Sequence, residues 1–412
     1  TNNGTASGFG ATGAVSWNTT VKTGDFTAVA GEGYFVNTTS GAINVTLPAG
    51  TAGAVVGIKD YAGTFDTNAV TLIQNGSDKI GGSTNNSVVS EEGIAVTLVF
   101  VDSTQGWLVT DSGLQSEAPG PEYISASGGT ESTCGNFKIH KFTGPGTFTV
   151  SSLGNAAGGS DKVDYLVVAG GGEGGSNGGG GGGGGFRESY TASVSGPYTA
   201  SPLANPTPLT VTATAFPITV GGGGSGPPGC ASGRTGSNSV FSSITSAGGG
   251  GGGDADGGSP VGQRTGASGG SGGGGSAPFP PPGPASGGAG NTPPVSPPQG
   301  NNGGGGYHQG CVYDAGGGGG GATAVGATGG NSASPAPAGN GGAGATTSIS
   351  GTPTGYAGGG NAGGCTPLRN PSPVGFGGGG YNEVGVINTG GGGGGNSNTG
   401  GSGIVIIRYR FQ

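Results

Sequence analysis

The fold is decided where an apolar strand runs directly into glycine, in residues 163–185, VDYLVVAGGGEGGSNGGGGGGGG. Residues 163–169 form a short apolar run of the kind that is buried on both faces of a sheet. Glycine then takes nearly every position, up to an unbroken run at 178–185. An isolated glycine run is floppy, because glycine loses the most conformational freedom when it is ordered. The run must therefore be held by its surroundings if it is structured.

Glycine runs recur to the end of the chain. Others lie at 221–224, 248–253, 272–275, 303–306, 316–321, 377–380 and 390–395. Their irregular spacing argues against a solenoid repeat of fixed length. In polyproline II geometry, with three residues per turn, the backbone N–H and C=O groups point outward, so glycine helices can pack side by side and hydrogen-bond to one another. At a rise of about 3.1 Å per residue, a six-residue run spans about 19 Å. The sequence predicts a slab of such helices with loops at its ends.

The region before the glycine domain has the pattern of a β module. Residues 43, 45 and 47 are Ile, Val and Leu, which share one face of an extended strand. Short β-rich runs separated by turn residues favour a small sandwich or barrel-like domain. The runs are Asp25–Ala30, Gly33–Asn37, Ala42–Leu47, Val55–Asp60, Val70–Gln74, Ile94–Val101 and Gly106–Thr110.

A second β patch leads into the glycine domain. Phe137–Phe142 is expected to pair with Gly146–Val150 as a hairpin across Thr143-Gly144-Pro145. The chain closes with 404–411, IVIIRYRF, another buried-type strand.

The expected fold class is an all-β N-terminal module followed by a polyglycine II helix sandwich, with essentially no α-helix. The expected layout is a linker or shaft end at 1–20, the β module at 21–113, a linker at 114–130, a hairpin and strand at 131–169, and the glycine-rich domain at 170–412.

Composition excludes several function classes. The 412 residues carry 110 glycines and a net charge of −8. An acidic chain is a poor nucleic-acid partner, and no apolar run approaches the roughly 20 residues of a membrane span. All six lysines precede residue 163 and all six arginines follow it. That break indicates two regions built on different physical principles.

Nothing in the sequence points to catalysis or to a cofactor. The two histidines are His140, expected to be an exposed residue on a strand beside two lysines, and His308, expected in a loop. Asp254 and Asp256 supply too few carboxylates for a persuasive calcium site. We therefore expect no enzyme, no metal and no cofactor.

The four cysteines fit no zinc motif. They are Cys134, Cys230, Cys311 and Cys365. The simplest interpretation is four small, partly buried thiols, while a disulfide between Cys311 and Cys365, which would staple two loops, is the alternative.

Four segments closely resemble the glycine-rich domain of phage tail proteins, with similarity over about residues 121–412: 165–172 (YLVVAGGG), 218–224 (ITVGGGG), 236–245 (GSNSVFSSIT) and 401–409 (GSGIVIIRY). The polyglycine sandwich of T-even-like long-tail-fibre adhesins implies receptor binding through distal loops. Residues 26–30, 43–48 and 59–63 resemble a module of cyanophage and marine myovirus fibre proteins, which implies a homo-oligomer, usually a trimer.

The candidate receptor-binding residues are aromatics and a histidine near or between glycine runs: Tyr307, His308, Tyr313, Phe279 and Tyr356. Tyr307, His308 and Tyr313 are favoured because they flank a cysteine in one compact loop. The alternative is that the aromatics only cap and pack the slab.

The function expected is that of a virion fibre protein or adhesin, extracellular when functional, which contacts other virion proteins and a host outer-membrane protein or glycan. A secreted, self-assembling microbial filament is the alternative, since six N-x-S/T sequons fall in the first 90 residues. A fibre-borne depolymerase is a third hypothesis.

Overall fold

The computed structural model describes residues 15–114, 121–155, 158–226, 232–254, 261–277, 285–307, 315–330, 337–363, 378–380 and 382–412. The chain divides into two compact units, Thr1–Gly120 and Pro121–Gln412. Within the described residues the helices are two single turns, α1 (Ala192–Ser195) and α2 (Val261–Arg264). The remaining regular structure is β-strand, which confirms the all-β fold class.

The first unit consists of two sheets around one apolar core. One sheet has the order β1-β3-β5-β8-β9 and the other β2-β4-β6-β7. The chain alternates between the sheets over its first six strands, and these strands pair in parallel within each sheet. The strands are β1 (Ser16–Lys22), β2 (Phe26–Thr27), β3 (Glu32–Val36), β4 (Ile43–Thr46), β5 (Val55–Asp60), β6 (Val70–Ile73), β7 (Ser87–Val89), β8 (Ile94–Phe100) and β9 (Trp107–Leu114).

The expected strands are present, and the alternation of residues 43, 45 and 47 is confirmed, since Ile43, Val45 and Leu47 are all buried in the core. Two strands were not expected: β7, and β1, which begins at Ser16 inside the segment predicted to be a linker. The parallel pairing was also not foreseen, because a period of two residues is the same in parallel and antiparallel strands.

The second unit also begins with two sheets, and its core lies between them. One sheet has the order β10-β13-β17-β18-β19, and the other is β11-β12-β22-β14-β15, with β16 beside β14. These strands are β10 (Ser125–Ser127), β11 (Thr130–Cys134), β12 (Phe137–Phe142), β13 (Gly146–Ser152), β14 (Lys162–Val168), β15 (Phe186–Glu188), β16 (Leu209–Thr210), β17 (Ala215–Thr219), β18 (Ser239–Phe241), β19 (Ile244–Ser246) and β22 (Ile404–Arg410).

The closing strand β22 lies between β12 and β14 in the middle of the sheet. This central position explains why the sequences of β14 and β22 are apolar at successive residues. Val405 and Ile407 face the core between the two sheets, while Ile404 and Ile406 pack on the other face, beside the hairpin β20 (Ala345–Thr347) and β21 (Thr354–Tyr356). Both faces of β14 and β22 are therefore covered, as expected of buried-type strands.

The predicted hairpin of residues 137–150 is wrong, although both of its strands exist. β12 pairs with β11 and β22, whereas β13 pairs with β10 and β17. Residues 143–145 carry the chain from one sheet to the other, so that Phe142 and Phe148 meet inside the core rather than across a ladder. In the sequence, a short turn between two alternating strands looks the same whether the strands pair as a hairpin or lie in two different sheets.

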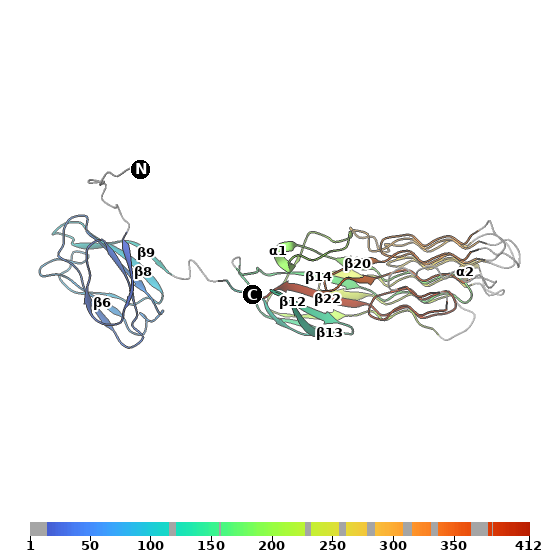
Figure 1. Ribbon diagram of the computed structural model, residues 1–412, viewed down its shortest axis with the longest axis horizontal. Coiled ribbons are helices and arrows are strands. Elements are labelled where there is room, and N and C mark those ends of the chain that lie inside the picture. The colour runs from blue at the N-terminus through green and yellow to red at the C-terminus, as the bar shows by residue number, and fades with distance from the viewer. Residues whose placement is uncertain are drawn as a thin grey trace. The chain divides into compact units, whose positions relative to one another are not determined.

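The glycine runs leave the sheets side by side (Figure 1) and bond to one another with a period of three residues. In the run 178–185, the N–H groups of Gly179, Gly182 and Gly185 donate to Gly253, Gly250 and Ala247. The N–H groups of residues 180 and 183 donate to a second segment, at 317 and 320. Those of residues 181 and 184 donate to a third segment, at 393 and 390. The carbonyls accept from three further segments, 169–175, 271–274 and 360–363. The run 178–185 therefore lies within a hydrogen-bonded array.

Glycine is needed in this array for space, and not for an unusual backbone conformation. A Cβ atom on Gly181 would lie 2.1 Å from the carbonyl oxygen of Gly172, and one on Gly180 would lie 2.0 Å from that of Gly360. The glycines of 178–185 do not have positive φ. Two positions at the margin differ, because a Cβ on Gly222 would meet nothing within 4 Å and one on Gly305 would meet nothing closer than 3.5 Å.

Candidate functional sites

The end of the glycine array away from the sheets is one candidate surface. The run 169–175 leaves β14 and the run 178–185 returns to β15, so Gly175 and Gly179, which are joined by a 2.9 Å hydrogen bond, mark that end. Gly253 bonds to Gly179, and Gly363 bonds to Gly178. Described residues that precede or follow 255–260 and 364–377 therefore lie at this end, which we call the distal end.

Tyr307 is the candidate receptor residue that the structure places at the distal end. Its N–H donates to the carbonyl of Ala315 at 2.8 Å, and the N–H of Ala315 donates back at 3.0 Å. Gly316, the next residue, donates to Gly363. Tyr307 is half-buried, so part of its side chain is accessible. His308, Tyr313 and Phe279 lie outside the described residues, as do Cys230, Cys311 and Cys365.

Tyr356 lies in a different environment from Tyr307. It ends β21, is 2% exposed, and packs with Ile139, Leu166 and Ile404 in the core that covers the outer face of β22. Burial raises the pKa of its hydroxyl. The ring is therefore part of the apolar packing of the second unit and is not at the distal end.

His140 is buried, so the expectation of an exposed histidine is wrong. Its Nδ1 lies 2.8 Å from the carbonyl of Gly128 and its Nε2 lies 3.0 Å from the hydroxyl of Tyr409. The carbonyl can only accept, so Nδ1 carries the proton and the Tyr409 hydroxyl donates to Nε2. Burial lowers the pKa of the imidazole. The flanking lysines were misleading, because β12 has protein on both faces.

A second polar cluster, around Asp164, fixes the segment that follows β15. The carboxylate of Asp164 accepts hydrogen bonds from the hydroxyls of Ser189 and Ser195, both at 2.7 Å, and from the N–H of Thr191 at 2.8 Å. Arg408 donates to the carbonyl of Ser195 at 2.8 Å. Burial raises the pKa of Asp164. Each serine hydroxyl donates to this carboxylate, while His140 is bonded elsewhere, so the cluster has the character of a structural anchor.

The expectation that Asp254 and Asp256 offer too few carboxylates for a calcium site is not tested, because Asp256 lies outside the described residues. Asp254 is buried. Within the described ranges, histidine, cysteine, aspartate and glutamate form no group of three or more that could hold a metal ion. Nor does that part of the chain contain a helix of the length and apolarity needed to cross a membrane.

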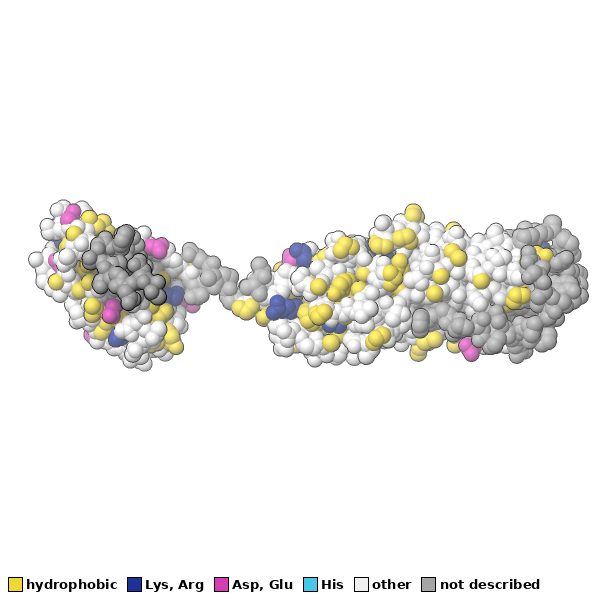
Figure 2. All heavy atoms as spheres, turned by 45° about the horizontal axis from the view of Figure 1, so that its top comes forward, with side chains coloured by type: hydrophobic (Ala, Val, Ile, Leu, Met, Phe, Trp, Pro, Cys, Tyr) yellow, Lys and Arg dark blue, Asp and Glu magenta, His cyan; other side chains and the backbone are white. Residues whose placement is uncertain are grey.

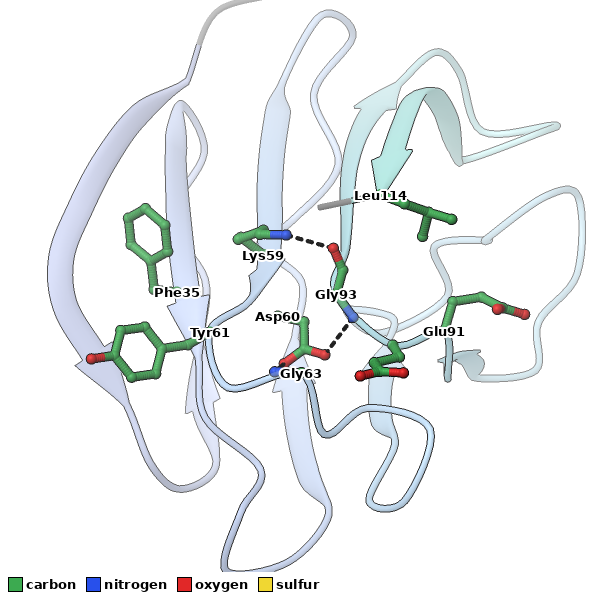
Figure 3. Close-up of a pocket in the computed structure, with 9 residues that line it drawn as sticks. Phe35, Lys59, Asp60, Tyr61, Gly63, Glu91, Gly93 and Leu114 are labelled. Carbon is green, nitrogen blue, oxygen red and sulfur yellow. Dashed lines mark hydrogen bonds between the residues drawn. The ribbon is translucent and has the colours of Figure 1, made fainter. Parts of the chain in front are cut away.

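A hollow of about 670 Å³ in the first unit is a feature that the sequence did not reveal. We call it the β5–β8 hollow; it is lined by Phe35, Lys59, Asp60, Tyr61, Gly63, Glu91, Glu92, Gly93 and Leu114. Figure 3 shows Phe35 and Tyr61 on one side and Leu114 on the other. The lining comes from strands far apart in sequence, which is why no local motif marked it.

Asp60 builds the frame of this hollow. One carboxylate oxygen accepts from the N–H groups of residues 62, 63 and 64, and the other accepts from Phe65 at 3.2 Å and Gly93 at 2.9 Å. Lys59 donates to the carbonyl of Gly93 at 2.5 Å (Figure 3). Neighbouring residues on β5 thus fix both loops that border the hollow.

Residues 142–410 match the glycine-rich domain family. The chain belongs to this glycine-rich domain family. Residues 5–117 match a second family, described as bacteriophage T4 gp9/10-like protein, N-terminal. Together the two matches identify this glycine-rich protein as a structural phage fibre protein and a virion component. No curated protein gives a significant match to the chain.

Proposed function

We propose that this phage fibre protein is an adhesin, in which the distal end of a packed polyglycine II slab contacts the host surface. The observation that carries the proposal is the three-residue period of hydrogen bonds around the run 178–185. Three residues per turn is the period of polyproline II geometry. A slab with this period is rigid, and binding residues are commonly carried on the ends of rigid scaffolds.

Surface composition supports a role in adhesion. On the face that Figure 2 shows, most of the described surface of the glycine region is backbone and uncharged polar side chains, with scattered apolar side chains and few charges. Such a surface can bind through hydrogen bonds and aromatic contacts with little dependence on salt. Tyr307 is a half-buried aromatic residue at the distal end, and aromatic residues are enriched at protein interfaces. We propose Tyr307, with His308, Tyr313 and Phe279, as the receptor-contacting set. The receptor would be a host outer-membrane protein or glycan.

We further propose that the first unit joins the fibre to the virion and that the chain acts as a homotrimer. The match of residues 5–117 to the bacteriophage T4 gp9/10-like family supports association with other tail proteins. The trimer rests on resemblance to fibre modules, and light scattering of the purified chain measures it directly. A monomeric mass at micromolar concentration would exclude the trimer and leave the fibre role intact.

The receptor proposal is tested with fluorescently labelled full chain on a panel of bacterial strains. We expect the wild-type chain to bind at least one strain, and a Tyr307→Ala, His308→Ala, Tyr313→Ala variant to lose most of that binding. The matched control is Thr133→Ala with Cys134→Ala on β11, which is exposed at the sheet-bearing part of the same unit. Equal binding by the distal variant and the wild-type chain, or loss in the control only, would refute the placement of the receptor surface.

A further inference from the structure

We propose that the β5–β8 hollow binds a basic side chain, arginine above all, presented by an extended segment of another virion protein. The site goes beyond the proposed receptor function, because it lies in the first unit and its ligand is a protein partner. The volume of about 670 Å³ falls within the range of about 300–1,000 Å³ found for binding pockets, which is room for more than one side chain.

The balance of charge in the hollow selects a cation. Four charged side chains line it: Lys59, Asp60, Glu91 and Glu92. Lys59 and Asp60 offset each other and are both engaged in holding Gly93 in place. The two glutamates remain, and both are exposed. The carboxylate of Glu92 lies over the loop at Gly63, where a Cβ atom would come within 3.6 Å of its Oε1.

The aromatic side of the hollow favours the same ligand. Tyr61 is 58% exposed, and Phe35 lies beside it (Figure 3). Phe35 packs against the ring of Trp17, with ring centroids 5.0 Å apart. A guanidinium group stacks on aromatic faces and bonds to carboxylates through its planar fork, whereas an ammonium group acts as a point charge. Rings on one side and carboxylates on the other therefore suit arginine better than lysine.

The frame of the hollow is rigid, so the site exists before its ligand arrives. The buried Asp60 holds residues 62–65 and Gly93 through backbone hydrogen bonds. Little ordering is then required on binding, which improves affinity. The match of this unit to the bacteriophage T4 gp9/10-like family supports a virion protein as the source of the segment.

The test is a calorimetric titration of the full chain with the peptide acetyl-GRGRG-amide, at low salt. A peptide with citrulline in place of arginine is the neutral control, because citrulline keeps the shape and loses the charge. We expect the arginine peptide to bind at least tenfold more tightly than the citrulline peptide. Equal affinity, or no binding of the arginine peptide at millimolar concentration, overturns the proposal.

Three variants locate the site. Glu91→Gln with Glu92→Gln should weaken binding of the arginine peptide at least tenfold, and Tyr61→Ala should weaken it about two- to fivefold, as expected for an exposed cation–π contact. Asp111→Asn, on the exposed part of β9, removes one negative charge outside the hollow and should leave the affinity within twofold. If Asp111→Asn weakens binding as much as the glutamate pair, the attraction is general, and the proposed site is wrong.

Discussion

Adding one methyl group inside the glycine array should destabilise the second unit strongly, and the substitution Gly181→Ala measures this. The new Cβ atom would lie 2.1 Å from the carbonyl oxygen of Gly172 and 2.6 Å from its carbon. An ordinary C···O contact is about 3.3–3.6 Å, so the two segments must separate by about 1 Å. Both sides of the contact are backbone, so no side chain can rotate away.

The separation breaks hydrogen bonds whose lengths are known. Gly172 donates to Gly182 at 2.8 Å and Gly175 donates to Gly179 at 2.9 Å. Lengthened by about 1 Å, both exceed the range of a hydrogen bond. Each costs about 1 kcal/mol in net stability, and more if its groups stay buried and unpaired. With about 1–3 kcal/mol for overpacking, the expected loss for Gly181→Ala is about 3–5 kcal/mol.

Gly222→Ala is the matched control, because its Cβ atom would meet nothing within 4 Å. Replacing glycine by alanine at a compatible position reduces the entropy of the unfolded chain and stabilises by about 0.4–1 kcal/mol. Gly222→Ala should therefore be neutral or slightly stabilising. Both substitutions make the same chemical change, so their difference isolates the packing of the array.

Differential scanning calorimetry of the full chain is the assay. The two compact units should unfold in separate transitions, so the transition of the first unit serves as an internal reference. At about 2 °C per kcal/mol for a unit of this size, Gly181→Ala should lower the second transition by about 6–10 °C, and Gly222→Ala should leave it in place. Equal shifts in the two variants, or none in either, would refute the reasoning.

Two further predictions concern single side chains of the second unit. Tyr356→Ala should lower the free energy of unfolding by about 3–5 kcal/mol, because removal of a large buried ring leaves a cavity. Tyr307→Ala should lower it by less than about 1 kcal/mol. Urea denaturation compares the two variants, and equal losses would contradict the placement of Tyr356 in the core and Tyr307 at the distal end. Burial lowers the pKa of His140, so the imidazole binds a proton more readily in the unfolded chain than in the folded one. The free energy of unfolding should therefore fall as the pH drops below about 6.5, by at most about 1.4 kcal/mol for each pH unit. His140→Gln should remove that part of the dependence, and an unchanged pH profile in the variant would exclude His140 as its source.

The sequence predicted the elements better than their partners. Residues 163–169 and 404–411 were identified as buried strands because apolar side chains occupy both faces, and both lie in one sheet, as β14 and β22. The partner of Phe137–Phe142 was missed, because β22 lies more than 260 residues away in sequence (Phe142 pairs with Val405). Local pairing was the wrong choice at a turn that crosses between sheets.

The candidate sites show the same limit. Glycine runs indicate that neighbouring segments pack closely. They carry no side chains that could specify which run lies next to which. The β5–β8 hollow was missed for a related reason, since Phe35, Tyr61 and Glu91 come together only through pairing of strands β3, β5 and β8. Tyr307 and Tyr356 are both aromatic residues near glycine, and only the three-dimensional structure separates a core ring from a distal one.

The most direct test of the central claim is hydrogen exchange, measured by mass spectrometry, of the glycine run 178–185. Each amide from Gly179 to Gly185 donates to another segment at 2.7–3.1 Å, so these amides should exchange only when the array opens, over hours or longer at neutral pH. A glycine run that serves as a flexible spacer would exchange completely within seconds. Slow exchange supports a packed slab, and complete exchange at the first time point would contradict it.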